Sequence, residues 1–277
     1  MPFLPRRAEG YYAVLSSYDN IFLHIGEMEV YKIIESHVHC GIQNAYLPFE
    51  YVKPSLDDAN IEAACMFPPV EDIYDRNNYC FEDTPSWQQC RKRANDYLLE
   101  LSLTENIYPY FFVWNDFKYE DLAQGFKGVK WHRHSYEPEY HYDDVRCEAF
   151  LQKVYALSLP IVFEETFENT LYFIKRVAGR TIVIIPHLGG LNGGFSRLLA
   201  SGIWQEENVY ADTALASPYE VYGFLENYGS EKLLYGSDFP FGLPSSEVGK
   251  IMRLNISRRD KENILGKNIL RILHVAE

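Results

Sequence analysis

The sequence predicts an α/β fold, a single (β/α)8 TIM barrel with a short N-terminal extension. Three observations predict it: eight short apolar runs follow one another, helical stretches separate most of them, and the 277 residues suit one barrel, which needs roughly 250. Alternating strands and helices favour a parallel sheet covered by helices. An open doubly wound sheet is the alternative. No GxGxxG turn follows an early run, so its dinucleotide-binding form has no support.

The predicted strands are short and rich in apolar residues. Residues 181–185 (TIVII) are typical of a strand that is buried on both faces. Pro and Gly fall between the runs, where they mark turns. In chain order, the predicted strands are 31–36, 61–67, 107–114, 128–132, 161–165, 181–187, 209–213 and 233–238.

Helical periodicity fills the spaces between the strands. Segment 88–103 repeats apolar residues at helical spacing, and segment 143–157 opens with two aspartates before doing the same. Segments 169–178 and 217–228 follow this pattern. Residues 1–30 precede the barrel domain, 31–277, as an extension. A helix at 11–18 and a hairpin at 21–30 are expected there, as a cap under the barrel floor or an arm for oligomerisation.

Charge and composition argue against several classes of function. The formal net charge is −13, whereas a nucleic-acid partner requires a basic face. No window approaches the roughly 20 apolar residues of a membrane span, and no apolar signal region follows Arg6 and Arg7. The five cysteines form no CxxC pair, which indicates reduced thiols. We therefore expect a cytoplasmic protein without nucleic-acid or membrane partners.

Polar residues at the ends of four predicted strands are the candidates for chemistry, because (β/α)8 barrels carry their active sites there. His37 and His39 alternate along the first strand, so both imidazoles share a face. Glu164, His187 and Asp238 end the fifth, sixth and eighth strands. Taken singly, each could be a packing histidine, a solvated glutamate or a turn aspartate. Together they predict one centre with nitrogen and oxygen ligands, which suit zinc and related ions.

The fourth strand supplies further candidates. Lys130, His132 and His134 occupy alternate positions and so share one face. A buried ion pair is the ordinary interpretation of Lys130, and a solvated loop that of Arg133 and His134. The functional interpretation assigns substrate binding to Lys130, Trp131, His132 and Arg133.

The same segments resemble the amidohydrolase superfamily, in the amidohydrolase-related branch that contains aminocarboxymuconate-semialdehyde decarboxylase. The matching segments are 34–39 (IESHVH), 126–130 (FKGVK), 159–164 (LPIVFE), 185–190 (IPHLGG), 234–240 (LYGSDFP) and the closing helix 263–273. The resemblance implies metal ligation by His37, His39 and Asp238. It also implies that His187 acts as a general base or orients the substrate.

Two residues depart from the family pattern. Glu35 stands where the family usually has aspartate, and Glu164 replaces the fifth-strand histidine. Glutamate can bind a divalent metal, so the expected ligands are His37, His39, Glu164 and Asp238 around one ion. Zinc is the first expectation and manganese the second. Alternatively, Glu164 does not ligate and the metal is weak or lost.

The run Gly128-Val-Lys130 also resembles the one whose carbamylated lysine bridges two metals in dihydroorotase and urease. The missing fifth-strand histidine favours a single metal over that arrangement.

The predicted function is metal-dependent hydrolysis of a small, carboxylated molecule by a metal-activated water. His187 and Asp238 would move the proton. Alternatives are a decarboxylase or hydratase (a lyase) at the same site, a metal-free lactonase-like hydrolase, and an inactive barrel that serves as a binding protein. The resemblance allows a homodimer.

Overall fold

The computed structural model describes residues 30–275. The chain divides into a unit of residues Met1–Tyr31 and a unit of residues Lys32–Glu277, and the second is described below. The helix expected at 11–18 and all but the last residue of the hairpin expected at 21–30 lie outside the described residues.

Within the described residues, eight strands form one sheet in the order β1-β4-β5-β6-β7-β8-β9-β10, with every neighbouring pair parallel. The strands are β1 (Ile34–His39), β4 (Ala63–Phe67), β5 (Ile107–Phe112), β6 (Gly128–His132), β7 (Ile161–Glu164), β8 (Val183–Ile185), β9 (Val209–Asp212) and β10 (Leu233–Leu234). Beyond β10 the chain returns to β1, where Ser36 donates from its backbone N–H to Tyr235 O and a bridge joins Val38 to Phe239. The predicted (β/α)8 barrel is confirmed.

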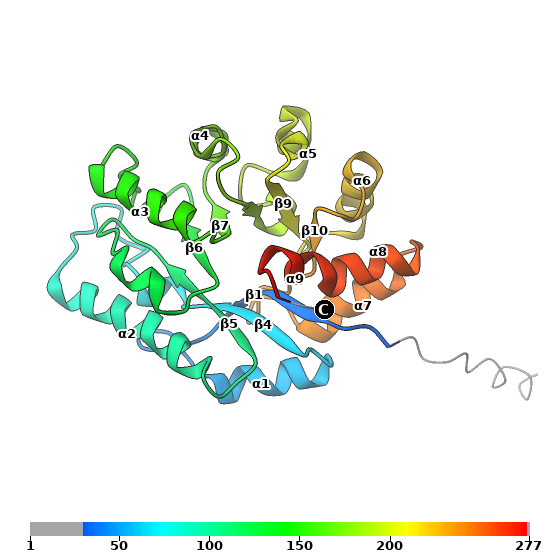
Figure 1. Ribbon diagram of the computed structural model, residues 1–277, viewed down its shortest axis with the longest axis horizontal. Coiled ribbons are helices and arrows are strands. Elements are labelled where there is room, and N and C mark those ends of the chain that lie inside the picture. Colours follow the sequence, from blue (N-terminus) through cyan, green and yellow to red (C-terminus); the bar gives the residue numbers. More distant parts are fainter. Residues whose placement is uncertain (1–29, 276–277) are drawn as a thin grey trace, which may run out of the picture. The chain divides into compact units, whose positions relative to one another are not determined.

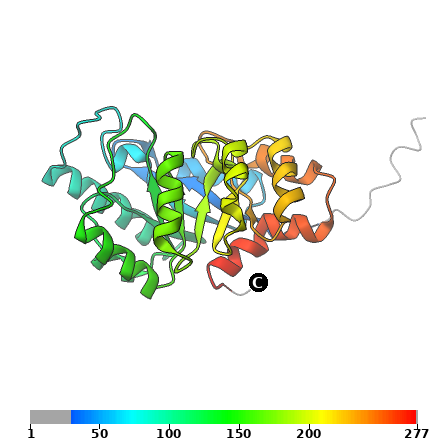
Figure 2. The same cartoon turned by 90° about the horizontal axis from the view of Figure 1, so that it is seen from above.

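Helices surround the strands, and the last of them lies beside β1 and β10 (Figures 1 and 2). They are α1 (Phe49–Asp58), α2 (Pro85–Leu101), α3 (Val145–Ala156), α4 (Phe167–Val177), α5 (Phe195–Ser201), α6 (Pro218–Tyr228), α7 (Pro244–Arg253), α8 (Arg258–Glu262) and α9 (Asn268–Ile272). The four helices predicted at 88–103, 143–157, 169–178 and 217–228 correspond to α2, α3, α4 and α6. A π-helical turn, η6 (Asn263–Lys267), joins α8 to α9.

The largest differences from the predicted bounds are in the first, sixth and eighth strands. The first runs to His39 rather than ending at residue 36, so both histidines belong to the strand itself. The eighth shortens to Leu233–Leu234, because the chain then turns to place Asp238 against β1. The strand predicted at 181–187 ends at Ile185, since His187 and Leu188 adopt left-handed backbone conformations. These turns aim polar side chains over the barrel.

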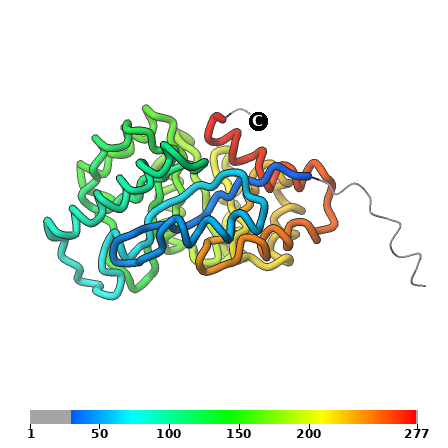
Figure 3. Tube along the Cα trace, turned by 90° about the horizontal axis from the view of Figure 1, so that it is seen from below, coloured from blue at the N-terminus to red at the C-terminus, as the bar shows by residue number. Residues whose placement is uncertain are grey.

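One apolar cluster fills the barrel near the start of the strands. Ile34, Ala63, Ile184 and Leu234 are buried there, and α9 packs against β1 and β10 through Ile269 and its neighbours. Figure 3 traces the beginning of β1 beside these last helices. Burying this end leaves the opposite end of the strands for the site.

None of the helices in residues 30–275 combines the length and the apolar character that crossing a bilayer requires.

Candidate active site at the C-terminal ends of the strands

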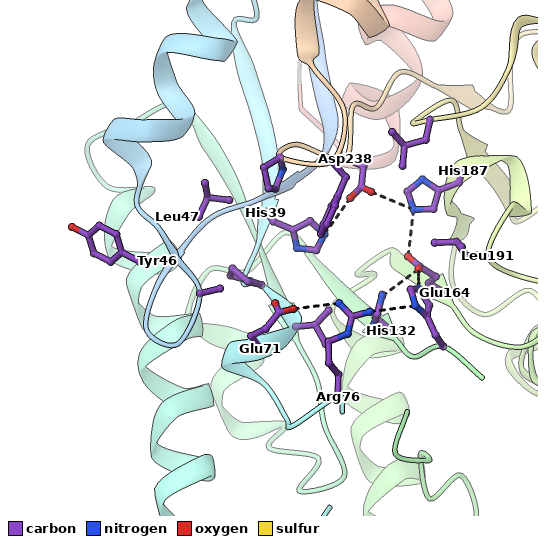
Figure 4. A pocket seen from close by; sticks show the side chains of 17 residues that line it. His39, Tyr46, Leu47, Glu71, Arg76, His132, Glu164, His187, Leu191 and Asp238 are labelled. Atoms are coloured by element: carbon purple, nitrogen blue, oxygen red, sulfur yellow. Dashed lines mark hydrogen bonds and ion pairs between the residues drawn. The ribbon is translucent and has the colours of Figure 1, made fainter. Parts of the chain in front are cut away.

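A cavity of about 490 Å³ lies at the carboxyl ends of the strands (Figure 4). Its polar side chains come from β1, β6, β7 and the segments that follow β4, β6, β8 and β10. Apolar side chains also line it. The polar set is His39, His132, His134, Glu164, His187, Asp238, Glu71 and Arg76, and the apolar set includes Tyr46, Leu47, Leu191, Leu215 and Phe241. Glu71 and Arg76 come from the loop after β4, which the sequence analysis did not single out.

His37, His39 and Asp238 come together as the sequence predicts. The His37 and His39 Nε2 atoms lie 3.3 Å and 3.2 Å from the same oxygen, Asp238 Oδ1. The Asp238 backbone N–H donates to His37 O at 2.8 Å, which fixes the turn after β10 against β1. Two imidazoles and a carboxylate therefore converge on one point.

The contacts of the two Nδ1 atoms show that Nε2 is the ring atom available to a metal ion. His37 Nδ1 lies 2.8 Å from Asp212 Oδ2, and His39 Nδ1 lies 3.3 Å from Pro68 O. Because carboxylate and carbonyl oxygens only accept, each Nδ1 carries the proton and each neutral ring keeps a lone pair on Nε2. Both Nε2 atoms face Asp238 Oδ1. Three converging acceptors are a chemically suitable donor set for a divalent cation.

The two imidazoles differ in charge when no metal is bound. Burial lowers the pKa of His39, so this ring is neutral. Burial and Lys130 also oppose protonation of His37, but the carboxylates of Asp212 and Asp238 outweigh them and raise its pKa to about 9. A proton on His37 Nε2 then bonds to Asp238, and a metal ion would replace that proton.

Asp212, at the end of β9, was missed by the sequence analysis. Its Oδ2 accepts from His37, and its Oδ1 accepts from the backbone N–H groups of His187 at 2.8 Å and Ala214 at 3.1 Å. Burial alone would raise the pKa of this carboxyl, but His37 and the His187 amide hold it below its usual value. A carboxylate ending the apolar run 209–213 was the available signal.

His187 faces the same centre from the turn after β8. Its Nδ1 lies 3.2 Å from Ala214 O and so donates, which leaves the Nε2 lone pair free in the neutral ring. That Nε2 lies 3.9 Å from Asp238 Oδ2 and 3.5 Å from Glu164 Oε2. His37, His187 and Asp238 each offer a ligand atom, and these atoms lie within 4.8 Å of one another.

Glu164 lies between two groups of histidines. Its Oε2 is 3.2 Å from Lys130 Nζ and 3.5 Å from His187 Nε2, and its Oε1 faces His132 and His134 at 3.2 Å and 2.7 Å. Burial opposes its charge, yet these cationic and hydrogen-bonding neighbours hold its pKa well below the usual range. Lys130 forms the buried ion pair that was its ordinary interpretation.

The four residues proposed for substrate binding lie on opposite faces of β6 and its continuation, because side chains alternate along a strand. His132 lines the cavity. Lys130 is fully buried beneath it, with Nζ 3.4 Å from His37 Nε2. Trp131 points the other way and packs among aromatic rings of α3 and α4, including Phe150 and Phe173. Arg133 also lies outside the cavity lining, and it donates to Glu137 O at 3.2 Å.

Comparisons with known proteins agree with this architecture. A family model described as amidohydrolase matches residues 118–275. A 2,6-dihydroxybenzoate decarboxylase from Rhizobium superposes with a TM-score of 0.70 at 14% identity, covering 88% of this chain and 99% of that one. No curated protein matches.

Two further solved structures share the fold. A putative 2-pyrone-4,6-dicarboxylic acid hydrolase from Pseudomonas putida has a TM-score of 0.66 at 16% identity, over 89% of this chain and 98% of that one. A dihydroxybenzoic acid decarboxylase from a Polaromonas species, with bound manganese and the inhibitor 2-nitroresorcinol, has a TM-score of 0.67 at 14% identity, over 88% and 97%.

Proposed function

This chain belongs to the amidohydrolase family, and from that premise we propose that it is a metal-dependent hydrolase of a small, carboxylated molecule. The observation that carries the proposal is the convergence of the His37 and His39 Nε2 atoms on Asp238 Oδ1 at the edge of the cavity. Nitrogen and oxygen donors in this arrangement suit a divalent ion.

His37, His39 and Asp238 would hold the ion, with Glu164 as the expected fourth ligand. Zinc is the first candidate for such a donor set, and the manganese in the Polaromonas decarboxylase supports manganese as the second. When bound, the ion supplies Lewis-acid chemistry: it polarises a carbonyl and makes a water more acidic.

His187 is the proposed general base. Its Nδ1–H is held by Ala214 O, so Nε2 is the atom that accepts a proton. Asp238 Oδ2 lies 3.9 Å from that Nε2, and a water oxygen between the two side chains could reach both. His187 would then return the proton to the leaving group, while Asp238 would orient the water.

The cavity supports a substrate with one polar and one apolar part. His132, His134 and Arg76 are among its polar lining residues, and Leu191 and Phe241 are among its apolar ones. Arg76 is the cationic side chain of this lining and is the proposed partner of a negatively charged group on the substrate, which would compete with Glu71 and Glu137 for its guanidinium.

A lyase is the second candidate, because two of the three similar structures described above are decarboxylases by name. In non-oxidative decarboxylation the same His187 would deliver a proton to the carbon that loses carbon dioxide. Product analysis separates the two reactions: an acid from a lactone or amide indicates hydrolysis, and carbon dioxide from a hydroxylated benzoate indicates a lyase.

The test compares His37→Ala with His187→Asn, and uses exposed His141→Asn as the control. His37→Ala should lose the zinc equivalent that His37, His39 and Asp238 would hold, and with it turnover. His187→Asn should keep zinc and the rise in Tm that zinc causes, but lose about 10²- to 10⁴-fold in kcat. Full turnover by metal-free protein would reject the proposal, and a protein that neither binds metal nor turns over any substrate class would be a binding barrel.

A further inference from the structure

A second group of metal-binding side chains lies in the same cavity, and we propose that His132, His134 and Glu164 form a separate site for a divalent transition-metal ion. His132 ends β6 and His134 follows two residues later, so they repeat the spacing of His37 and His39 on β1. This site is additional to the proposed function and uses different imidazoles. It shares Glu164 with the first site, because Oε2 of this residue lies toward His187 while Oε1 faces His132 and His134.

The donor atoms of the second site are close together. His132 Nε2 and His134 Nε2 lie 3.2 Å and 2.7 Å from one oxygen, Glu164 Oε1. The three donors lie within 4.8 Å of one another, and all three side chains line the cavity. Two imidazoles and one carboxylate with access from the cavity are ligands of the kind that zinc and manganese use.

The Glu137 carboxylate lies near the Nδ1 atoms of both imidazoles. Glu137 Oε2 lies 3.7 Å from His132 Nδ1, and Glu137 Oε1 lies 3.6 Å from His134 Nδ1. The Tyr74 hydroxyl donates to Glu137 Oε2 at 2.7 Å and lies 3.3 Å from His132 Nδ1. Metal-bound histidines characteristically direct their other nitrogen at such a carboxylate, which orients the ring.

Metal binding would change the hydrogen bond between Arg76 and His134. Its Nη2 donates to His134 Nδ1 at 3.2 Å, so in this arrangement His134 carries its proton on Nε2 and donates it to Glu164. With an ion bound at Nε2, the neutral His134 ring would carry its proton on Nδ1, which lies 3.6 Å from Glu137 Oε1. Arg76 keeps two carboxylate partners when it releases His134, because its Nε donates to Glu137 Oε1 at 2.7 Å and its Nη1 to Glu71 Oε1 at 3.3 Å.

The charge around the cavity favours an additional cation. Carboxylates of Glu71, Glu137, Glu164 and Asp238 gather there with the cationic side chains of Arg76 and Lys130. Lys130 is not a ligand in this arrangement. Its ammonium pairs with Glu164 Oε2 and leaves Oε1 to the two histidines. The two oxygens of Glu164 thus serve different neighbours.

Zinc stoichiometry tests the proposal without any substrate. Full-length protein is stripped with a chelator, returned to chelator-free buffer and titrated with Zn²⁺ by calorimetry, with elemental analysis after gel filtration. The wild type should bind two equivalents. His134→Gln should bind one, and a Co²⁺ titration should lose one set of absorption bands. His134 is partly exposed, so this change should leave the fold intact, and His141→Gln is the matched control that keeps two equivalents.

His39→Gln separates this proposal from the proposed function. It should remove one equivalent and leave the one that depends on His134. The alternative outcome is a wild type that binds a single equivalent. If His39→Gln loses that equivalent and His134→Gln keeps it, the second site is overturned and the first stays in place. A single equivalent lost in His134→Gln and kept in His39→Gln would support the second site and reject the first.

Discussion

At the scale of the residue, Asp212 links parts of the site that are far apart in the sequence. It accepts from the His37 ring and from the backbone of His187, whose left-handed φ of 57° is unfavourable for a residue with a side chain. One carboxylate therefore orients a proposed metal ligand and supports the turn that carries the proposed base.

Asp212→Asn is expected to weaken metal binding by about 10- to 100-fold, because an amide cannot accept from both His37 and the His187 turn as a carboxylate does. Competition with a zinc-binding dye measures this. Asp57→Asn, exposed on α1, is the control and should bind zinc like the wild type. Equal affinity in all three proteins would mean that Asp212 does not orient His37.

Asp72 provides a pH-dependent prediction away from the proposed ligands. Burial raises the pKa of this carboxyl to about 6, against the lowering effect of backbone donors such as Ala45 N–H. As pH rises from about 4 to 6, the unfolded chain loses this proton before the folded protein does. Ionisation of Asp72 therefore lowers stability across that window.

Asp72→Asn removes this titration. The free energy of unfolding of the variant minus that of the wild type should increase between pH 4.5 and pH 7, as measured by urea denaturation. Asp58→Asn, exposed on α1, should track the wild type across the same range. A difference for Asp72→Asn that is flat or decreases with pH would contradict the assignment.

At the scale of the element, strand alternation determines which side chains reach the cavity. On β6 it directs Lys130 and His132 inward and Trp131 toward α3 and α4. The alternation that grouped Lys130, His132 and His134 in the sequence already separated them from Trp131 and Arg133. Substrate contacts are therefore expected from alternate positions and not from the whole run.

The start of α6 illustrates how local sequence fixes an element. Ser217 accepts from the Glu220 backbone, and the Glu220 side chain accepts from the Ser217 backbone at 2.8 Å, which forms a capping box. Ser217→Ala should cost about 1 kcal/mol of stability in urea denaturation. Ser246→Ala, at an exposed position of α7, should change stability little. Equal losses in both variants would argue against the cap.

At the scale of the whole molecule, the fold buries four of the five cysteine thiols and exposes one. Cys80 is exposed, whereas Cys40, Cys65, Cys90 and Cys147 are buried. Burial raises the pKa of the Cys40 and Cys147 thiols to about 12, which suppresses their thiolate forms.

A thiol reagent such as Ellman's reagent should modify one thiol rapidly in native protein and the other four only on unfolding, measured by absorbance. Cys80→Ser should abolish the fast phase and leave the slow one. Two or more fast thiols in the wild type would show that the barrel opens more readily than this burial implies.

The sequence by itself determined the barrel and the strand ends that carry the chemistry. Local apolar patterning sets strands and helices, and parallel closure then directs the ends of β1, β7 and β8 and the turn after β10 to one mouth. That reasoning identified His37, His39, Glu164, His187 and Asp238, which lie around the cavity or directly beneath it.

Only the tertiary structure decided which atoms face one another. Asp212 meets His37 across 175 positions, and Arg76 meets Glu137 across 61. Glu164 lies between two histidine groups because β6 and β8 flank its strand in the sheet. Such contacts depend on the register and closure of the strands and on loop paths, and these arise from packing throughout the chain rather than from any local pattern.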